Sequence, residues 1–324
     1  MDSRIPIYSE EWLLFTMLCE TGSLKQTADM FSISISTASR TLKKLEDDLG
    51  ITLFDRSVKP MELTQEGRTL LKELTPAMKE AGRVIHRLKM DTYQRPELRI
   101  GFLDSFSYSL VPYFLSSISN RVSRITCLTG SSDRLIERLR AHELDVIMSS
   151  DPIDSESYWK KLLMIQERSV LVLPKDINIR QQETVTWGQL SLCNLPFIGS
   201  YNKSGRGKLI EAFINTHNIP ITGITTVDNG SVKLKLVSLN KGWTITSPLA
   251  LLNHQDLLAS LQVLPLPSPG VSRKVYLIGA TNIDQDFFNL IYDTFRSSVK
   301  EHLLPKLDLI ADWVKDGFEF KNRQ

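Results

Sequence analysis

The feature that most constrains the fold is a regular alternation of strand-like and helix-like runs after Pro96. The first part of this alternation contains apolar strand-like runs and helix-like segments in the order 98–103, 107–120, 125–128, 132–141 and 144–148. Such an order is typical of a parallel α/β architecture. Later strand-like runs predict a second lobe, at 169–173, 196–199, 224–227, 242–246 and 261–265. The run 274–279 and a helix at 284–303 are expected to return to the first lobe.

These runs predict a two-lobed α/β domain over residues 94–304. Lobe I is expected at about 97–167 and 268–304, and lobe II at about 168–267. The segment 305–324 carries apolar residues that resemble the face of an amphipathic helix. This helical tail is expected to pack on the domain, or alternatively to help form a tetramer.

Residues 1–64 predict an all-α winged helix-turn-helix domain with a short hairpin as its wing. Gly22 and Ser23 suit the end of one helix and the start of the next. A further helix carries one apolar stripe, formed by Ala38, Leu42, Leu45 and Leu49. Strand-like runs at 51–54 and 61–63 flank a turn and complete the order helix, helix, turn, helix, hairpin.

The face opposite this stripe is polar, which is typical of a helix that enters the major groove of DNA. Hydroxyl groups and arginine near its N-terminus suit bases or phosphates, and cations further along and in the wing suit phosphates. The candidate DNA-binding residues are Ser34, Ser36, Thr37, Ser39, Arg40, Lys43, Arg56 and Lys59. The alternative is a solvated face on a helical bundle, since residues 1–92 contain 13 Lys and Arg against 14 Asp and Glu.

The N-terminal segment closely resembles the LysR-type transcriptional regulator family. The positions that carry the resemblance are Phe15, Gly22-Ser23-Leu24, Ala28, Ser34, Ser36, Ser39-Arg40, Leu45-Glu46, Leu49-Gly50, Leu53-Phe54, Arg56, Leu63-Thr64 and Gly67. The resemblance implies a regulator that binds double-stranded promoter DNA and senses a small molecule through a C-terminal domain similar to periplasmic binding proteins. RNA polymerase is a further candidate partner. Ile35 departs from the family pattern, because members often carry a glutamine there.

Residues 65–93 predict one long linker helix with an apolar seam at spacings of four and three residues. The seam consists of Leu70, Leu74, Ala77, Ala81, Val84 and Leu88. A heptad seam favours helix pairing, and the resemblance also implies dimerisation through this helix. We therefore expect a homodimer or homotetramer. The alternative is that the helix packs on its own chain, and Pro76 is expected to kink or restart it.

The candidate effector-binding residues follow strand-like runs of the C-terminal domain. Open α/β sheets bind ligands beyond the carboxyl ends of their strands, and helix N-termini there favour anions. The candidates are Ser105, Ser107, Ser131, Ser149, Ser200, Ser204 and Asn229, and they predict a polar or anionic effector. Each of them could instead cap a helix. Arg206 and Lys208 could add positive charge or belong to a solvated face. Asn240 and Trp243 depart from the family pattern, and the indole could shape the pocket or belong to the core.

The remaining sequence features argue against other classes of protein. The three cysteines and five histidines show no disulfide framework and no metal-ligand spacing. We find no catalytic signature, so we expect neither an enzyme nor a cofactor. No run of apolar residues is long enough to span a membrane. A cytoplasmic protein that associates with the nucleoid when bound to DNA is expected. The alternatives are a solute-binding protein without a DNA response and an enzyme built on the α/β domain.

Overall fold

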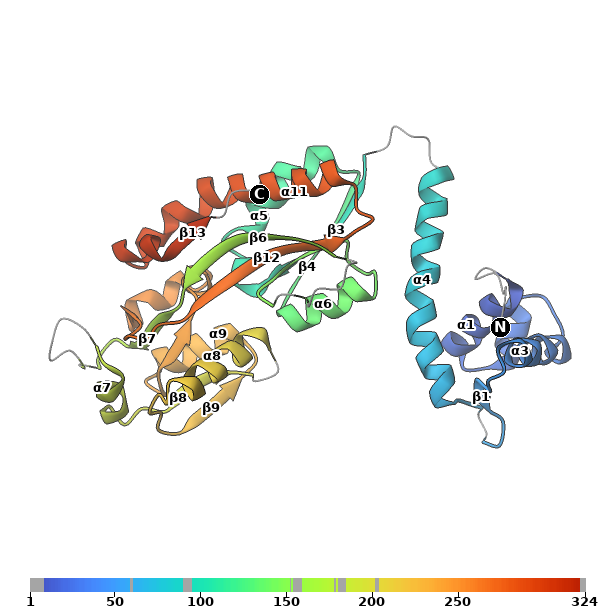
Figure 1. Ribbon diagram of the computed structural model, residues 1–324, viewed down its shortest axis with the longest axis horizontal. Helices are drawn as coiled ribbons and strands as arrows, with labels where there is room; N and C mark the ends of the chain where they lie inside the picture. Colours follow the sequence, from blue (N-terminus) through green and yellow to red (C-terminus); the bar gives the residue numbers. More distant parts are fainter. Residues whose placement is uncertain are drawn as a thin grey trace. The chain divides into compact units, whose positions relative to one another are not determined.

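The computed structural model describes residues 9–58, 61–89, 95–151, 153, 159–177, 179, 185–201 and 204–320. The chain divides into two compact units, Met1–Gln94 and Arg95–Gln324 (Figure 1). Each unit has its own hydrophobic core, and each is described separately below.

The N-terminal unit is a winged helix-turn-helix, as the sequence predicts. Its elements are α1 (Glu10–Thr21), α2 (Leu24–Met30), α3 (Ile35–Leu49), β1 (Phe54–Asp55), β2 (Glu62–Leu63) and α4 (Gln65–Lys89). Gly22 and Gly50 end α1 and α3 in the left-handed conformation, at φ 63° and 68°. The side chains of Ser23 and Ser34 cap α2 and α3 by accepting bonds from backbone N–H groups.

The core of this unit joins the apolar stripe of α3 to the other helices and the wing. Its buried residues are Trp12, Leu14, Phe15, Leu18, Ala28, Ala38, Leu42, Leu45, Leu53, Phe54 and Leu74. The helix α4 packs closely on the segment that leads into the wing. A Cβ added at Gly67 would overlap the Leu53 carbonyl oxygen, so the close approach requires glycine. The helix α4 runs through Pro76 as one element and does not restart there.

Lobe I of the C-terminal unit is built on a six-stranded sheet in the order β13-β6-β12-β5-β3-β4. The strands are β3 (Glu97–Leu103), β4 (Arg124–Gly130), β5 (Val146–Ser149), β6 (Trp159–Arg168), β12 (Ser272–Ala280) and β13 (Phe318–Phe320). The strands β4, β3 and β5 are parallel, whereas β12, β6 and β13 are antiparallel to their neighbours. The predicted parallel arrangement thus holds for β4, β3 and β5, and the strands β12, β6 and β13 add antiparallel pairs to it.

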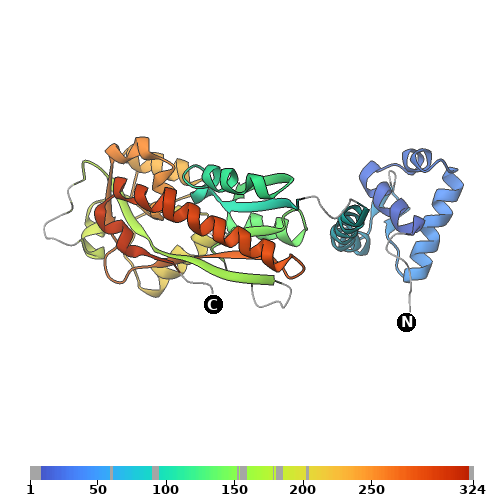
Figure 2. The same cartoon turned by 90° about the horizontal axis from the view of Figure 1, so that it is seen from above.

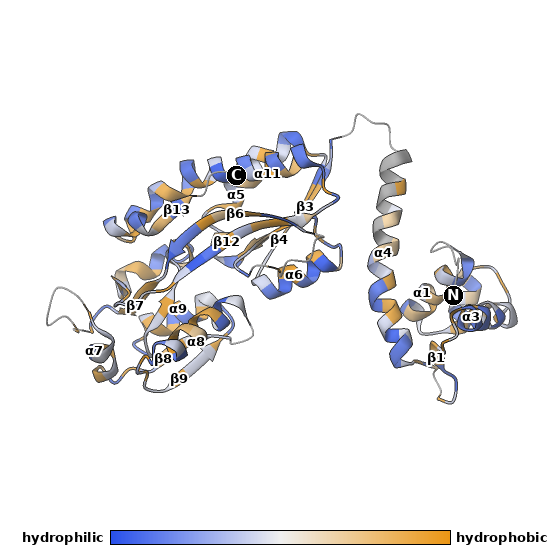
Figure 3. Cartoon of the chain, viewed as in Figure 1, coloured by the Kyte–Doolittle hydropathy of each residue, from blue (hydrophilic) through white to orange (hydrophobic). Residues whose placement is uncertain are grey.

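Helices cover both faces of this sheet. The helices α5 (Val111–Ile118) and α11 (Gln285–Ser298) pack together on one face, and α6 (Ser132–Arg140) lies on the other (Figures 1 and 2). Figure 3 shows both blue and orange residues on α11, which turns Phe288, Ile291, Tyr292 and Phe295 into the core.

Lobe II contains two small sheets. The strands β7 (Val170–Pro174), β10 (Thr244–Thr246) and β11 (Leu261–Pro265) form an antiparallel sheet, and β8 (Phe197–Ser200) pairs in parallel with β9 (Ile224–Val227). A bridge between Phe197 and Trp243 links the two sheets. The helices of this lobe are α7 (Trp187–Leu192), α8 (Gly205–Thr216), α9 (Gly230–Ser238) and α10 (Pro248–Leu252).

Two departures from the family pattern have structural explanations in lobe II. Trp243 is 1% exposed and its ring lies 4.8 Å from that of Phe197, so the indole belongs to the core. Asn240 adopts φ 58°, a conformation that asparagine tolerates better than most residues other than glycine.

The chain passes between the lobes along two pairs of strands. The strand β6 leads through Ser169 into β7, and β11 returns to β12. The strand β6 was not predicted, because Lys160, Lys161 and Glu167 interrupt its apolar pattern.

The segment after α11 does not form the predicted amphipathic helix. It continues as a π-helical turn (Val299–Leu303), two 3₁₀ segments (Leu304–Leu309 and Asp312–Gly317) and β13, which pairs with β6. Pro305 cannot donate a backbone hydrogen bond, which favours the change from regular helix. The tail packs within the chain, as expected: Leu307 and Val314 are buried, and Ile310 and Trp313 contact the cores of both lobes.

Candidate functional site

Three hydroxyl groups form a cluster at the N-terminus of α3. Ser34 Oγ accepts a hydrogen bond from the Thr37 backbone N–H at 3.1 Å. It also lies 2.8 Å from the hydroxyl oxygens of Ser36 and Thr37. Ser34 and Ser36 are exposed, and Thr37 is half-buried. The helix therefore presents hydroxyl groups at its N-terminus, the end by which a recognition helix enters a major groove.

The cationic side chains of α3 differ in their partners. Arg40 and Lys43 are exposed, and Ser39 is half-buried beside them. Arg40 Nε donates only a long bond, 3.4 Å, to the Ser36 carbonyl. Lys44 pairs with Glu11 at 2.8 Å, and this hydrogen bond is the main reason that the pKa of Glu11 falls to about 2. Arg40 and Lys43 are thus the cations of α3 that remain available to phosphates or bases.

The wing is fixed by a buried carboxylate that the sequence analysis did not single out. Glu46 Oε1 accepts bonds from the backbone N–H groups of Leu53 and Phe54, at 2.8 and 3.1 Å. Glu46 Oε2 accepts a bond from Arg56 at 2.7 Å. Arg56 therefore braces the wing, and a role for it at a phosphate stays a prediction. Lys59 lies outside the described residues.

Part of the predicted seam of α4 packs within its own unit. Leu70 and Leu74 pack against the core of their own unit. Ala77 is exposed and Ala81 is half-buried. The side chains of Val84 and Leu88 lie outside the described residues. Intrachain packing therefore accounts for the first part of the seam, and helix pairing remains a prediction for the rest.

Most of the predicted effector-binding residues serve local structure. Ser204 and Asn229 cap α8 and α9 through their side chains. Ser149 exchanges hydrogen bonds with the backbone of Asp151. Ser107 bonds to the Asp104 carbonyl, and Ser131 precedes α6 without a side-chain cap bond. These residues do not converge on one point.

Ser105 and Ser200 differ from the other candidates, because each contacts a cation whose side chain is buried. Ser105 Oγ accepts two bonds from Arg273 at 3.2 Å, and Ser200 Oγ accepts one from Lys233 at 3.0 Å. Neither Arg273 nor Lys233 was predicted from the sequence. The available signal was a cation within an apolar strand run and another within an apolar helix run.

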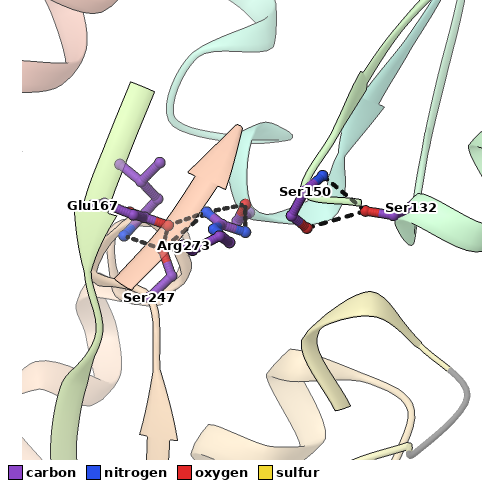
Figure 4. Close-up of polar contacts among 7 residues, drawn as sticks. Ser132, Ser150, Glu167, Ser247 and Arg273 are labelled. Carbon is purple, nitrogen blue, oxygen red and sulfur yellow. Dashed lines mark hydrogen bonds and ion pairs between the residues drawn. The ribbon is translucent and has the colours of Figure 1, made fainter. Parts of the chain in front are cut away.

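Arg273 forms a buried polar cluster with residues of both lobes. Arg273 of β12 and Glu167 of β6 lie opposite each other in the sheet and form an ion pair, at 4% and 0% side-chain exposure. Ser247 donates to Glu167 at 2.6 Å and accepts from Arg273 at 3.1 Å (Figure 4). This cluster holds the Arg273 guanidinium in one position at the boundary of the lobes.

A cavity of about 460 Å³ lies at this boundary. Residues of lobe I and of α8 line it together, among them Ser150, Asp151, Arg206, Lys208, Arg273 and Lys274. Ser150 is held by hydrogen bonds to Ser132 at the start of α6 (Figure 4). The cavity therefore lies between two lobes, a common place for a ligand, and charged side chains are among its lining residues.

Two buried cations near this boundary lack full compensation. The two terminal nitrogens of Arg206 are buried without a hydrogen-bond partner among the described residues. Burial, and then the charge of Arg273, lower the pKa of Arg206 to about 9. Burial, and then the charge of Arg206, lower the pKa of Lys233 to about 7. The boundary of the lobes thus carries excess positive charge.

Other chemistry has little support in the described part of the chain. No group of three or more His, Cys, Asp or Glu side chains there is arranged to hold a metal ion. Burial raises the pKa of the Cys19 and Cys127 thiols to about 12 and 11, which disfavours the reactive thiolate. Among the helices described, none is both long and apolar enough to cross a membrane.

Comparison with known proteins gives matches over both units. Residues 10–68 match the family described as bacterial regulatory helix-turn-helix protein, lysR family, and residues 92–282 match the LysR substrate binding domain. The probable nitrogen assimilation transcriptional activator of Synechococcus elongatus is 27% identical over 271 residues, which cover 81% of this chain and 85% of that protein.

Solved structures show the same fold at low identity. A full-length OxyR variant from Pseudomonas aeruginosa superposes with a TM-score of 0.62 at 17% identity, covering 97% of this chain and 98% of that one. Full-length CbnR, in complex with its target DNA, gives 0.59 at 18% identity, covering 92% and 100%.

Proposed function

This chain belongs to the LysR family of transcriptional regulators, and from that premise we propose that α3 is its DNA-reading helix. The observation that carries the proposal is the exposed polar N-terminal face of α3, opposite its buried stripe. The proposed contacts come from Ser34, Ser36, Thr37, Ser39, Arg40 and Lys43, with Arg56 and Lys59 at the wing. The complex of the related CbnR with its target DNA supports this proposal.

The proposed partner is double-stranded promoter DNA, read by two copies of the chain. A homodimer, or a homotetramer built from it, would present two copies of α3 to the half-sites of a symmetric operator. The dimer contact would be made by α4 from Ala77 onward, because Leu70 and Leu74 are committed to the core of their own unit. RNA polymerase is a further proposed partner. We propose that the protein is cytoplasmic and associates with the nucleoid when it is bound to DNA.

The C-terminal unit binds the effector, and we propose that the effector is a polar or anionic small molecule. Its site would be the cavity between the lobes, whose lining includes Arg206, Lys208 and Arg273. Ser105 would act there indirectly, by orienting Arg273, and the other predicted effector-binding residues are not among those that line the cavity. We propose no catalytic role for the chain, because its relatives act as transcriptional regulators.

Selection of genomic DNA fragments by the purified full chain tests the DNA-binding proposal. The selection compares the wild type, Arg40→Ala and the control Arg124→Ala, which removes an exposed arginine from the other unit. We expect the wild type and the control to enrich one dyad-symmetric sequence at near-physiological salt, and Arg40→Ala to lose about tenfold or more in affinity. Equal enrichment by Arg40→Ala would contradict the role of α3.

A further inference from the structure

The cavity between the lobes carries an excess of positive charge. Its described lining residues include four cations, Arg206, Lys208, Arg273 and Lys274, but only one carboxylate, that of Asp151. Glu167 adds one negative charge behind Arg273, and its Oε1 is engaged by Arg273 and Ser247. Its Oε2 has no hydrogen-bond partner among the described residues, and its charge offsets part of that of Arg206. Four cations against two carboxylates leave a surplus of about two positive charges. A ligand with two negative charges would balance the cavity.

Arg206 identifies where one negative group of such a ligand would bind. Its terminal nitrogens are buried and have no partner among the described residues. An unpaired buried charge is costly, and a guanidinium is shaped to donate two parallel bonds to a carboxylate or a phosphate. Asp151 does not fill this position, because its carboxylate lies against Gly205, where a Cβ would overlap it. A bound ligand would supply the missing acceptor.

The second negative group would bind at the two other cations of the cavity. Lys208 and Lys274 also line the cavity, and both are exposed. The terminal nitrogens of Arg206 and the side chain of Arg273 are buried. The positive charge is thus arranged as a buried pair of arginines and an exposed pair of lysines. A molecule with a single acidic group would satisfy only one of these pairs.

We propose that the cavity binds a compact molecule with two acidic groups, each a carboxylate or a phosphate. One group lies between Arg206 and Arg273, and the other lies at Lys208 and Lys274. The proposal rests on the proposed function, in which this unit holds the effector between its lobes, and it specifies the chemistry of that effector. Because Arg206 belongs to α8 of lobe II and Arg273 to β12 of lobe I, the bound group would tie the two lobes together.

The electrostatics of the neighbouring lysine support this assignment. Lys233 donates to Ser200 at 3.0 Å, and its low pKa reflects burial together with the charge of Arg206. An anion at Arg206 would offset that charge and make protonation of Lys233 more favourable.

Binding of three small acids to the full chain tests the proposal. The probes are succinate and 2-phosphoglycolate, which carry two acidic groups, and butyrate, which has four carbons like succinate but one acidic group. Calorimetric titration at constant ionic strength gives the dissociation constants. We expect the two-acid probes to bind about tenfold or more tightly than butyrate. The proposal is overturned if neither two-acid probe binds, or if succinate and butyrate bind equally.

Substitutions assign the two groups to the two pairs of cations. Arg206→Gln should weaken succinate and 2-phosphoglycolate about tenfold or more, whereas the control Arg124→Gln should bind them like the wild type. The double variant Lys208→Gln with Lys274→Gln should reduce succinate binding to the level of butyrate. Wild-type binding by Arg206→Gln or by the double variant would overturn the assignment. The thermal unfolding midpoint of each variant without probe shows whether it is folded.

DNA binding of the same preparations separates the two proposals. A wild-type chain that binds its selected DNA but none of the two-acid probes would contradict only the effector chemistry. A chain that binds the probes but no specific DNA would contradict only the proposed role of α3.

Discussion

Glu46 Oε2 accepts a hydrogen bond from Arg56 at 2.7 Å, so that the third helix of the N-terminal unit holds its wing through a side-chain pair. The other oxygen of Glu46 satisfies the backbone N–H groups of Leu53 and Phe54. The position of the wing therefore depends on one buried carboxylate.

Substitution of Glu46 should open the wing. Glu46→Ala leaves two backbone N–H groups without their acceptor, so the free energy of opening there should fall by about 2 kcal/mol. Arg56→Ala removes only a partly exposed partner and should cost about 0.5 kcal/mol. Amide hydrogen exchange at Leu53 and Phe54 measures both effects. Unchanged protection in Glu46→Ala would contradict this account.

A side chain at Gly205 should displace the Asp151 carboxylate. The Cβ of Gly205→Ala would overlap the Asp151 carboxylate, whereas the Cβ of Gly188→Ala would meet nothing within 4 Å. We expect Gly205→Ala to lower the free energy of unfolding by about 1 kcal/mol and Gly188→Ala to be neutral or stabilising. Adding Asp151→Ser to Gly205→Ala should recover part of the loss. Denaturant unfolding of the four variants gives the double-mutant cycle, and simple additivity would argue against the contact.

Lys233 should make stability depend on pH. Its pKa is about 7 in the folded protein and 10.5 in the unfolded chain, so between these values the unfolded state holds a proton that the folded state lacks. Stability should therefore rise with pH above about 7, and the cost of burying the lysine is fully present at lower pH. The stabilisation by Lys233→Met should be roughly 2 kcal/mol larger at pH 7 than at pH 9. Urea unfolding of the wild type and of Lys233→Met at the two pH values provides the test. If the difference between their free energies of unfolding did not change with pH, the pKa of Lys233 would not be perturbed.

Trp313 should contribute more to stability than Leu309, another apolar residue of the C-terminal tail. The indole contacts the cores of both lobes, whereas Leu309 is 57% exposed. We expect Trp313→Ala to lower the free energy of unfolding by about 2 kcal/mol and Leu309→Ala by less than about 0.5 kcal/mol. Thermal unfolding of the C-terminal unit within the full chain measures the loss of stability in each of the two variants. Equal effects would mean that the indole does not hold the tail on the lobes.

Local signals made the N-terminal unit predictable. Gly22, Ser23, Ser34 and Gly50 mark helix ends through their own backbone preferences and side chains, and the structure places each of them at a cap. The hairpin was predicted longer than it is, because the N–H groups of residues 53 and 54 bond to a side chain and not to a partner strand.

Long-range contacts made the C-terminal site harder to predict. Glu167 and Arg273 are far apart in the sequence, and only the pairing of β6 with β12 makes them neighbours. Arg206 was considered as a source of positive charge, but the local sequence does not show that its terminal nitrogens are buried. Serines after strands gave a weaker signal, because a hydroxyl group there serves equally well as a helix cap.

The pairing of β13 with β6 has a consequence for biosynthesis. The segment between β6 and β12 carries lobe II as a continuous insertion with its own core, which can form while the ribosome is still translating. The six-stranded sheet, in contrast, joins strands that are distant in the sequence and is complete only after residue 320 has left the ribosome. Lobe I, whose strands are the first to be synthesised, is therefore completed after lobe II. Until β13 has been synthesised, the edge of β6 is unpaired and needs protection from other strands.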